Sequence, residues 1–490
     1  MIIKRDKDTI QSYFEDSSNL KGGYADEVVI PSTTDEIIAY VKESHKLGRP
    51  ILVSGGGTAT TGARVPFGGA VLSMERFNRI ISIDSQDMAC VILSGVLVEA
   101  LKNAVESKGL FYTSHPTENT AFVGGTIATN ASGARSFKYG PIRAYVKSLS
   151  MILADGTPLT LRRGEKKLTH QDSAIELPGG RRINIPIPSY KMPSVKSAAG
   201  YFAYDGVDAI DLFIGQEGTL SIITEAEIAL VKRPKKIIGA FVFFDTEAKA
   251  WDFADMARKS SRSEGKRPGG IDALSIEYFD NHSLDLLRSK TENVPGSAKS
   301  AIFFEQESSD ALEDAIIDAW TSLIERAGSS DKNTWVAFTE EEHDKFLGYR
   351  HMIPSTMNEL IRRSGFQKIS TDCAVPESSF FEIMNFYRKA LNDGGIGYYV
   401  FGHIGECHLH VNIFPKTEEE LLRAREIYMA IVKKVVSLGG TVSAEHGIGK
   451  LKQKYLEVMY GAEGIADMAA IKRSLDPKYI LGRGNILSYP

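Results

Sequence analysis

Cysteine is scarce in this sequence, and its few copies are scattered. Cys90, Cys373 and Cys407 are the three cysteines among 490 residues, and no Cys-x-x-Cys pair occurs. An odd number of distant cysteines does not fit a disulfide framework. The spacing also lacks the closely placed thiolates that hold an iron–sulfur cluster. We therefore expect neither feature in this protein.

Long apolar runs and a charge excess of one sign are also absent. No apolar run reaches the roughly 18 residues of a membrane-spanning helix, and the opening MIIKRDKDTIQSYF lacks the apolar core of a signal peptide. With 58 Lys and Arg against 62 Asp and Glu, the formal net charge is −4. No dominant basic field would attract nucleic acid. We expect a cytoplasmic protein that binds no nucleic acid; peripheral membrane contact, a homodimer and a partner subunit stay open.

The chain is long enough for two domains, because one hydrophobic core stops growing at roughly 250–300 residues. Short apolar strands alternate with helical segments from the start, and this pattern restarts at about residue 238 after the basic stretch Lys232-Arg-Pro-Lys-Lys236. The mixture predicts an α+β fold. We expect a first domain over 1–234, a second over 235–438 and a C-terminal segment over 439–490.

The first predicted helix lies between two predicted strands. It follows a strand at 28–30, ends at Gly48 and precedes a strand at 51–53. Farther along, the stretch 151–161 predicts a hairpin with Asp155-Gly156 at its turn. The expected apolar face of the helix holds Ile37, Ile38, Val41 and Leu47.

Three stretches are rich in glycine and other small residues. The first, Ser54-Gly-Gly-Gly-Thr-Ala-Thr-Thr-Gly62, follows a predicted strand, where glycines let backbone amides approach a phosphate. It is not the fingerprint of nicotinamide enzymes, because no helical pattern starts at Thr60. The others are 115–133, in which both halves are crowded with small residues, and the tight turn at 215–225. Alone, the first stretch fits a plain turn as well as a ligand site. The small residues of 115–133 indicate that a ligand or another backbone approaches closely.

Histidines gather in one short segment. Phe401-Gly-His-Ile-Gly-Glu-Cys-His-Leu-His-Val-Asn412 holds three of the ten histidines. In a strand over 407–414, His408, His410 and Asn412 share one face. Such a cluster, completed by one carboxylate, suits a divalent metal, and Glu445-His446 is the candidate from elsewhere in the chain. A single histidine would more often be a hydrogen-bonded core residue.

Taken together, these stretches resemble the FAD-binding proteins of the vanillyl-alcohol oxidase and p-cresol methylhydroxylase superfamily. The chain is most similar to the branch of D-lactate dehydrogenase, glycolate oxidase and D-2-hydroxyglutarate dehydrogenase, from about residue 25 to 487. The resemblance implies a two-subdomain FAD-binding domain over 1–234. It implies an α+β substrate (cap) domain with an antiparallel sheet and the metal motif over 235–438, and a C-terminal helical segment over 439–490 that returns to the flavin site.

The same resemblance implies how FAD is held. Some members attach the flavin through a histidine of the first loop; none stands there, so we expect noncovalent FAD. The implied pyrophosphate cradle is Gly55, Gly56, Gly57, Thr58 and Thr60, and the implied further flavin contacts are Pro116, Thr117, Gly124, Gly125, Thr129, Asn130, Gly133, Glu217, Gly218 and Ile223.

The family pattern Gly-His-x-Gly-Asp-Gly-Asn-x-His-x-Asn and a later Glu-His-Gly imply the metal site and the substrate site. The sequence departs from the pattern at Glu406-Cys407-His408, where Asp-Gly-Asn is usual, and this leaves His408 and Glu406 as further candidates for the metal. The implied ligands of a Zn, Fe or Mn ion are His403, His410 and Glu445; His446 is the implied base, Asn412 a substrate contact, and Arg350 and Lys368 the cations for the substrate carboxylate.

The resemblance implies oxidation of a small, D-configured 2-hydroxy acid to the 2-oxo acid, with hydride passing to flavin N5. A quinone, a cytochrome, an electron-transfer flavoprotein or oxygen would then take the electrons. Two alternatives stay open. One is a transferase similar to alkylglycerone-phosphate synthase, favoured by the tail Leu481-Gly-Arg-Gly-Asn-Ile-Leu487 but opposed by Glu445-His446, where that family has a run of histidines. The other is the flavin subunit of a multi-subunit glycolate or lactate oxidase. Which 2-hydroxy acid is used stays open.

Overall fold

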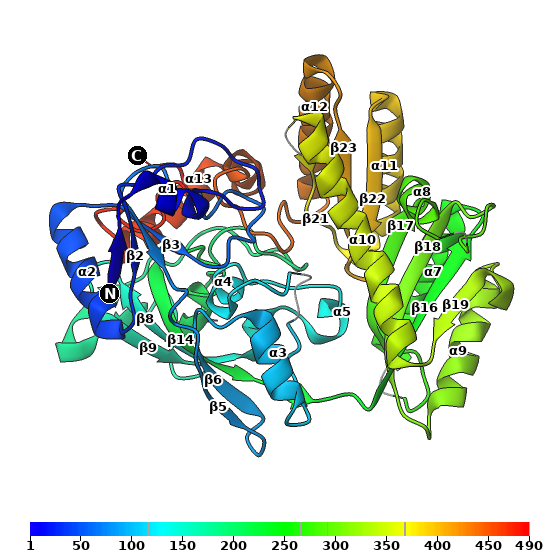
Figure 1. The fold of residues 1–490 in the computed structure, drawn as a ribbon, viewed down its shortest axis with the longest axis horizontal. Helices are drawn as coiled ribbons and strands as arrows, with labels where there is room; N and C mark the ends of the chain where they lie inside the picture. The colour runs from blue at the N-terminus through cyan, green and yellow to red at the C-terminus, as the bar shows by residue number, and fades with distance from the viewer. Residues whose placement is uncertain (115–117, 265–266, 292, 367–368, 490) are drawn as a thin grey trace.

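The structure, a computed structural model, describes residues 1–114, 118–264, 267–291, 293–366 and 369–489. It has two lobes (Figure 1). One lobe contains the blue and cyan N-terminal half together with the red C-terminal helix, and the other contains the green and yellow elements from about residue 236 onward. Mixed helix and strand content in two lobes confirms the predicted α+β fold.

The first sheet has four strands in the order β1-β2-β4-β3, with β2 and β3 both parallel to β4. Helix α2 (Thr34–Leu47) covers it; Thr33 caps its start and Gly48, at φ 67°, ends it. Ile37 and Val41 are fully buried, as predicted, but Leu47 is 60% exposed. At about 100° per residue, Leu47 is turned roughly 80° from Ile37, so the predicted face was one residue too long. The strands are β1 (Ile2–Lys4), β2 (Glu27–Ile30), β3 (Ile51–Ser54) and β4 (Ala70–Ser73).

The second sheet of this lobe has five strands in the order β5-β6-β14-β8-β9, and the described pairings within it are antiparallel. The predicted hairpin is present, with Gly156 at φ 81° in the turn between β8 and β9. The strands are β5 (Ile80–Asp84), β6 (Ala89–Leu93), β8 (Val146–Leu153), β9 (Pro158–Arg162) and β14 (Ser221–Ala229); the helices nearby are α3 (Val98–Glu106), α4 (Val123–Ala128), α5 (Ser136–Tyr139) and α6 (Ala209–Leu212).

Short elements complete this lobe. The charged excursion after β9 forms two small ribbons, β10–β13 and β11–β12, and β7 pairs with β15. Their bounds are α1 (Lys7–Ile10), β7 (Leu110–Phe111), β10 (Lys167–Leu168), β11 (Ala174–Glu176), β12 (Arg182–Asn184), β13 (Val207–Asp208) and β15 (Val231–Lys232).

The second lobe is an antiparallel sheet in the order β19-β16-β18-β17-β22-β23-β20, covered by helices on both faces. Alternate residues of β16 serve opposite sides: Phe241 and Phe243 pack toward α8 and α10, while Val242 belongs to the core that includes Trp251 of α7 and Trp320 of α9. The strands are β16 (Lys236–Phe244), β17 (Ala273–Asp280), β18 (Ser300–Ser308), β19 (Thr334–Ala337), β20 (Ile369–Ser370), β22 (Gly397–Gly402) and β23 (His408–Phe414), and β21 (Cys373–Ala374) also pairs with β23.

The helices of the second lobe are long, and one of them reaches the site described below. Helix α10 carries Pro354 in its interior and starts with a capping box between Thr339 and Glu342. The helices are α7 (Glu247–Glu264), α8 (Asn281–Arg288), α9 (Glu313–Arg326), α10 (Glu340–Ser364), α11 (Phe380–Gly394) and α12 (Glu418–Ser437).

The last segment of the chain crosses back to the first lobe. After a loop over 439–452 comes α13 (Gln453–Leu475), interrupted at Gly461, whose φ is 67°. The backbone N–H of Ile51 in β3 then donates to the carbonyl of Ile480 over 2.7 Å. The C-terminal segment is thus helical over α13 only. Its loops connect the second lobe, called the cap lobe below, to the first sheet of the flavin lobe, as we call the first.

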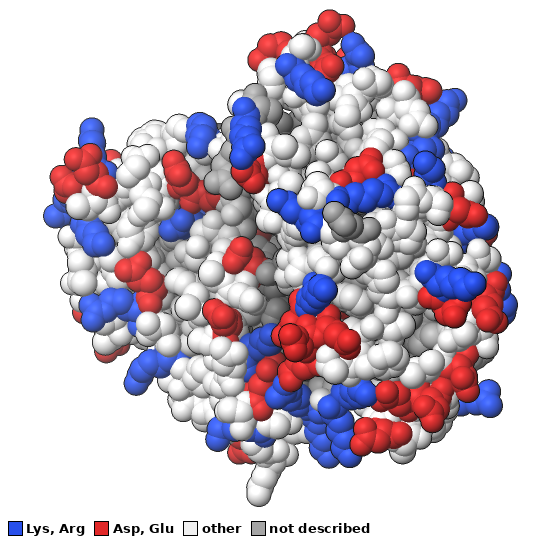
Figure 2. All heavy atoms as spheres, turned by 45° about the vertical axis from the view of Figure 1, so that its right-hand side comes forward, with Lys and Arg blue, Asp and Glu red and all other residues white. Residues whose placement is uncertain are grey.

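Two surface properties agree with the sequence. On the face shown in Figure 2, Lys and Arg side chains alternate with Asp and Glu side chains, so this face carries no broad field of one sign. Within the described residues, none of the helices has the length and apolar character needed to cross a membrane.

Candidate active site

A cavity of about 400 Å³ opens where the glycine-rich stretches meet the cap lobe. Residues of both lobes line it, together with residues of the C-terminal segment. It therefore has the composition of a site shared between domains. The described residues predicted to contact FAD that line this cavity are Gly55, Gly56, Gly57, Thr58, Thr60, Gly124, Gly125, Thr129, Gly133, Glu217, Gly218 and Ile223.

The small residues are required by close packing of the loops. A Cβ added to Gly56 would lie 2.5 Å from the carbonyl oxygen of Thr120, and one added to Gly124 would lie 2.4 Å from Cβ of Ser94. Neither neighbour could move easily, because backbone is involved in both contacts. Loop packing therefore requires glycine at both positions, and both glycines present backbone without a side chain at the wall of the cavity. The residues present fit a dinucleotide such as FAD.

Three predicted contacts stand apart from the rest. Asn130 is buried at the end of α4 with φ 48°, its side-chain amide donates to the carbonyl of Ser197 over 3.3 Å, and it is not among the described residues that line the cavity. Its role as a flavin contact stays a prediction. Pro116 and Thr117 lie outside the described residues.

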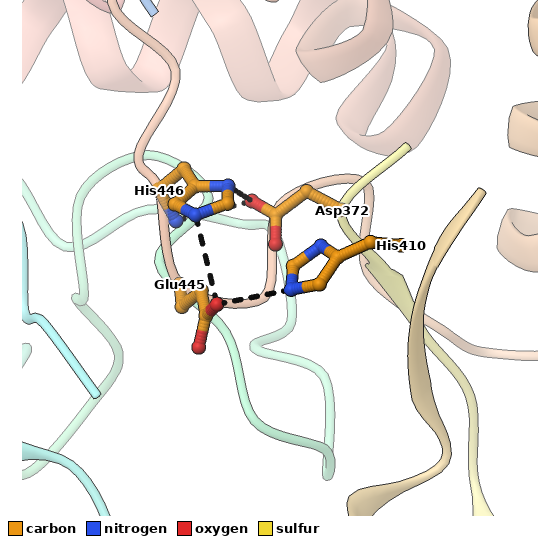
Figure 3. A group of neighbouring side chains, drawn as sticks. All are labelled: Asp372, His410, Glu445 and His446. Carbon is orange, nitrogen blue, oxygen red and sulfur yellow. Dashed lines mark hydrogen bonds and ion pairs between the residues drawn. The ribbon is translucent and has the colours of Figure 1, made fainter. Parts of the chain in front are cut away.

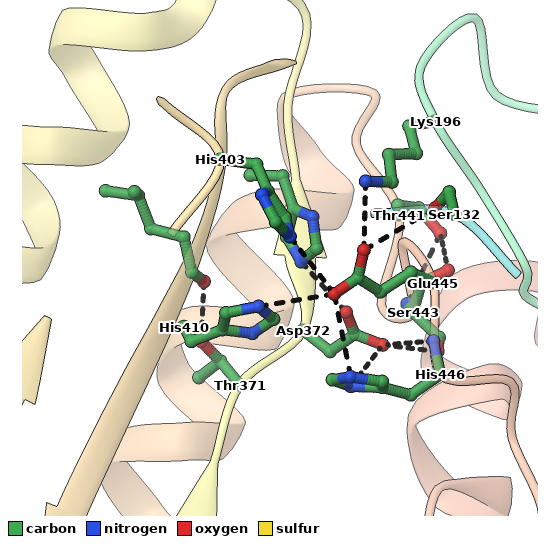
Figure 4. A network of polar contacts seen from close by, with 12 residues as sticks. Ser132, Lys196, Thr371, Asp372, His403, His410, Thr441, Ser443, Glu445 and His446 are labelled. Carbon is green, nitrogen blue, oxygen red and sulfur yellow. Dashed lines mark hydrogen bonds and ion pairs between the residues drawn. The ribbon is translucent and has the colours of Figure 1, made fainter. Parts of the chain in front are cut away.

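At the cap end of the cavity, three imidazoles converge on one carboxylate oxygen. Nε2 of His403 and Nε2 of His410 each lie 3.3 Å from Oε1 of Glu445, and Nε2 of His446 lies 3.6 Å from it (Figures 3 and 4). All four side chains line the cavity. The predicted metal ligands and the predicted base are thus neighbours. Side chains of this kind are the usual ligands of divalent transition metals.

Local backbone geometry brings the histidines together. Strand β22 ends at Gly402, whose φ of 126° is a conformation for glycine, and a short turn follows before β23 begins at His408. His403 at the start of this turn and His410 in β23 then lie with ring centroids 5.5 Å apart. The predicted strand is confirmed over 408–414.

Behind His403, a second carboxylate fixes the ring. Nδ1 of His403 lies 2.6 Å from Oε1 of Glu277 in β17, and Nε of Arg350 donates to Oε2 of Glu277 over 2.9 Å. Burial alone would raise the pKa of Glu277, but Arg350 and His403 outweigh it and hold this pKa at about 2. A carboxylate on one ring nitrogen leaves the other for a metal, and this is the usual arrangement of metal-binding histidines.

His446 is held in a similar way by Asp372. The backbone N–H of His446 donates to Oδ2 of Asp372 over 3.0 Å, and its Nδ1 lies 3.5 Å from the same oxygen. Lys452 and Ser443 also donate to Oδ2, over 2.7 and 2.8 Å. Burial would raise the pKa of Asp372, but Lys452 and the nearby histidines hold it well below its usual value. Burial lowers the pKa of His446 to about 4.

Lys196 lies between two glutamates of the site. Its Nζ is 3.0 Å from Oε2 of Glu445 and 3.0 Å from Oε2 of Glu406, and its own side chain is 5% exposed (Figure 4). Glu445 therefore turns one oxygen to the lysine and the other to the histidines. Glu406 is neutralised by the same lysine.

Of the residues predicted to contact the substrate carboxylate, the structure describes Arg350 but not Lys368. Arg350, Pro354 and Asn358, spaced by four along α10, all line the cavity, and Asn412 of β23 lines it as well. Lys368 lies outside the described residues. Two residues farther on, Ser370 in β20 does line the cavity.

Sequence reasoning missed Lys196, Asp372 and Glu277. For Glu277 a signal existed: β17 is buried along its whole length, so a carboxylate in this apolar strand needs partners. Asp372 lies four residues after Lys368, but a single aspartate at this place has no pattern that assigns it a role. Lys196 follows a Pro-rich excursion and carries no pattern that would single it out.

Comparisons with known proteins agree with this geometry. Residues 25–162 match the model of the FAD binding domain, and residues 233–486 match that of the C-terminal domain of FAD linked oxidases. The glycolate oxidase subunit GlcD of Bacillus subtilis (strain 168) is 30% identical over 94% of this chain and 89% of its own length. A D-lactate dehydrogenase of Archaeoglobus fulgidus is 28% identical, covering 94% of this chain and 91% of its own.

Solved structures share the fold at lower identity. A p-cresol methylhydroxylase superposes with a TM-score of 0.72 at 15% identity, covering 99% of this chain and 94% of its own. An alkyldihydroxyacetonephosphate synthase gives a TM-score of 0.67 at 17% identity, covering 98% and 81%. These likenesses confirm the predicted fold of the vanillyl-alcohol oxidase type. The domain matches and the 30% identical relative show that the chain belongs to the family of FAD-linked oxidases.

Proposed function

We propose that the protein oxidises a small D-2-hydroxy acid to the corresponding 2-oxo acid, with noncovalent FAD and one divalent metal ion. The observation that carries the proposal is the convergence of His403, His410 and His446 on Glu445 in the wall of the cavity that the glycine-rich loops also line. It combines a metal donor set, a base and a flavin cradle in one space. The relatives named D-lactate dehydrogenase and glycolate oxidase subunit support this substrate class.

The residues of the chain divide the work. When bound, FAD supplies the hydride acceptor at flavin N5 and the metal ion supplies a Lewis acid. His403, His410 and Glu445 would hold the ion. His446 accepts the hydroxyl proton of the substrate; its ring is oriented by Asp372, and its lowered pKa keeps it unprotonated. Arg350 binds the substrate carboxylate as a fixed planar cation, supported by Asn412 on the same wall.

The cationic side of the substrate site is modest, and this favours a small acid. Arg350 already shares its charge with Glu277. Beyond it, the described α10 residues that line the cavity are Pro354 and Asn358, which are neutral. From the described residues we therefore infer a monocarboxylate of the size of lactate or glycolate; the predicted carboxylate contact of Lys368 lies outside them. The electron acceptor stays one of quinone, cytochrome, electron-transfer flavoprotein or oxygen.

The decisive experiment is anaerobic flavin reduction. Purified protein with its flavin and metal contents measured is mixed with matched D- and L-lactate, D- and L-2-hydroxybutyrate, D-2-hydroxyglutarate and glycolate, and the flavin absorbance is followed. We expect rapid bleaching by a D-monocarboxylate, loss of bleaching after metal chelation, and recovery when Zn²⁺ or Mn²⁺ is restored. If flavin and metal are both bound and none of these acids bleaches the flavin, the proposal is wrong.

The same measurement separates the alternatives. A transferase without net redox change, such as the structurally similar alkyldihydroxyacetonephosphate synthase, would not be reduced by a hydroxy acid. A flavin subunit of a larger enzyme would bleach but would pass electrons onward only with its partner chain. Turnover is therefore measured with an artificial electron acceptor and, separately, with a cell extract that contains any partner chain. A complete enzyme turns over without the extract, whereas a subunit requires it.

A further inference from the structure

His408 is buried in the histidine cluster, yet its ring is not hydrogen-bonded. The side chain is fully buried, and neither Nδ1 nor Nε2 has a hydrogen-bond partner within the described part of the chain. A buried imidazole without partners costs free energy, because it loses its water without replacement. Polar atoms left in this way inside a protein require an explanation, and a ligand of the ring is the direct one.

A second unpartnered atom faces the ring. Nε2 of His408 lies 2.9 Å from Oδ1 of Asp372, and among the described residues Oδ1 also has no hydrogen-bond partner. The two atoms are therefore close without the angle of a hydrogen bond. The contact with Asp372 therefore satisfies neither ring nitrogen of His408. The other oxygen of Asp372 is already occupied by His446, Lys452 and Ser443.

His408 also has the right neighbours. One ligand atom each of His403, His408 and Glu445 lies within 4.8 Å of the others, and the same holds for Asp372, His410, Glu445 and His446. The two groups share Glu445. The ring centroids of His403 and His408 are 5.2 Å apart, and those of His408 and His410 are 4.7 Å apart. With 5.5 Å between His403 and His410, the three rings form a triangle of nearly equal sides, so His408 is adjacent to both histidines already assigned to the ion.

The neighbouring candidate Glu406 is excluded by its own contacts. Its Oε2 is engaged by Lys196 over 3.0 Å and by Ser136 over 2.6 Å. Lys196 also binds Oε2 of Glu445, but Oε1 of Glu445 faces the histidines, whereas Glu406 belongs to neither group of neighbouring potential ligands among the described residues. A neutral imidazole is an ordinary ligand of Zn²⁺, Co²⁺ or Mn²⁺.

We propose that His408 is a further ligand of the metal ion, giving this chain a site of three histidine nitrogens and the Glu445 carboxylate. The proposal rests on the proposed metal site. A third imidazole makes the site richer in nitrogen than His403, His410 and Glu445 alone. Mg²⁺, which prefers oxygen ligands, should therefore bind more weakly than Zn²⁺, Co²⁺ or Mn²⁺.

The test uses Co²⁺ as the probe on the flavin-loaded protein after chelator treatment. Co²⁺ affinity, stoichiometry and visible absorption are measured for the wild type, for His408→Asn and for His343→Asn. His343 is a matched control, because it is also a buried histidine beside a carboxylate, with Nε2 2.8 Å from Oε1 of Glu305. We expect the wild type to bind one Co²⁺ per chain. In His408→Asn the absorption band should shift and the affinity for Co²⁺ should fall by roughly ten-fold or more. In His343→Asn both should stay as in the wild type.

The outcomes are distinct. If the wild type binds no Co²⁺, Zn²⁺ or Mn²⁺, the proposed metal site itself fails. If the wild type binds one Co²⁺ and His408→Asn binds it with the same affinity and spectrum, His408 is no ligand and merely pairs with Asp372. Two ions per chain would also overturn the single-ion proposal.

Two further measurements cover a folding failure of His408→Asn. The variant His408→Gln keeps a polar side chain, and thermal unfolding reports whether each variant is folded. The wild-type Co²⁺ complex needs no variant: counting its hyperfine-shifted imidazole N–H signals by NMR should give three histidine ligands. Two signals, assigned to His403 and His410, would contradict the proposal.

Discussion

Two buried clusters of histidine and carboxylate among the described residues differ in how completely their polar atoms are paired. We call Glu305, His343, Arg135 and Ser275 the interface cluster. The site cluster is the group of histidines around Glu445 with Asp372 and Asn412. In the interface cluster, Glu305 accepts from Arg135 over 2.7 Å and from Ser275 over 2.7 Å, and His343 lies 2.8 Å away. In the site cluster, both nitrogens of His408, Oδ1 of Asp372 and Oδ1 of Asn412 have no hydrogen-bond partner among the residues described.

The difference separates structure from function. Arg135 comes from the flavin lobe, whereas Glu305, Ser275 and His343 come from the cap, so the interface cluster joins the lobes and needs nothing more. The site cluster lines a cavity, and in our proposal the metal ion supplies the partners that its atoms lack. Both contain charges out of water, which are tolerated only when paired. The same residue types therefore serve stability in one place and binding in the other.

The largest expected effect is on chemistry in the site cluster. Replacing His446 with Gln removes the base but keeps a polar side chain, so flavin reduction by the hydroxy acid should slow by roughly 10²–10⁴-fold. The unfolding midpoint and the metal content should stay close to wild type. Stopped-flow flavin reduction measures the rate. A wild-type rate in this variant would show that the proton is accepted elsewhere.

In the interface cluster the expected effect is on stability. Glu305→Gln leaves Arg135 buried without its counter-charge, so the free energy of unfolding should fall by about 3–5 kcal/mol while Co²⁺ affinity is unchanged. Burial alone would raise the pKa of Glu305, but Arg135 and His343 hold this pKa well below its ordinary value of 4.5. The carboxylate therefore stabilises the fold above that value, and the contribution is lost as the pH falls below it.

Denaturant titrations of wild type and Glu305→Gln at pH 7 and at about pH 4 check both signs. The difference between the two proteins should be largest at pH 7 and should shrink on acidification. A variant with weakened Co²⁺ binding would instead mean that the two clusters are coupled.

Metal removal should affect stability in one cluster only. A bound ion stabilises the folded state by RT ln(1 + [L]/Kd), about 2.7 kcal/mol at a concentration 100 times the Kd. Chelation should therefore lower the unfolding midpoint of the wild type and of Glu305→Gln by similar amounts, and it should have no effect on Glu445→Gln. Thermal unfolding with and without excess Zn²⁺ measures this. A shift that survives in Glu445→Gln would place the ion elsewhere.

The same contrast explains what the sequence could predict. Glycine-rich loops and clustered histidines are local patterns, so Gly56, His403 and Glu445 could be proposed before the structure, and they line one cavity. Glu277 and Lys196 could not be placed in the site, because their partners are distant in sequence: 126 residues separate Glu277 from His403, and 210 separate Lys196 from Glu406. Periodicity predicted the strand of His408, but the position of its ring beside Asp372, which comes from another segment, could not be predicted.

The smallest expected effects come from one matched pair of hydroxyl deletions. Oγ of Ser275 donates to Oε2 of Glu305 over 2.7 Å in a fully buried setting, so Ser275→Ala should destabilise the protein by about 1–3 kcal/mol. Oγ of Ser132 is 3.5 Å from Oε2 of Glu445, at the limit of a hydrogen bond, and Lys196 binds the same oxygen more closely. Ser132→Ala should therefore change stability by less than about 0.5 kcal/mol. Denaturant unfolding of both variants, with bound metal, measures the pair. If both variants lost the same free energy of unfolding, the site cluster would stabilise the fold as much as the interface cluster does, and the distinction between the two clusters would fail.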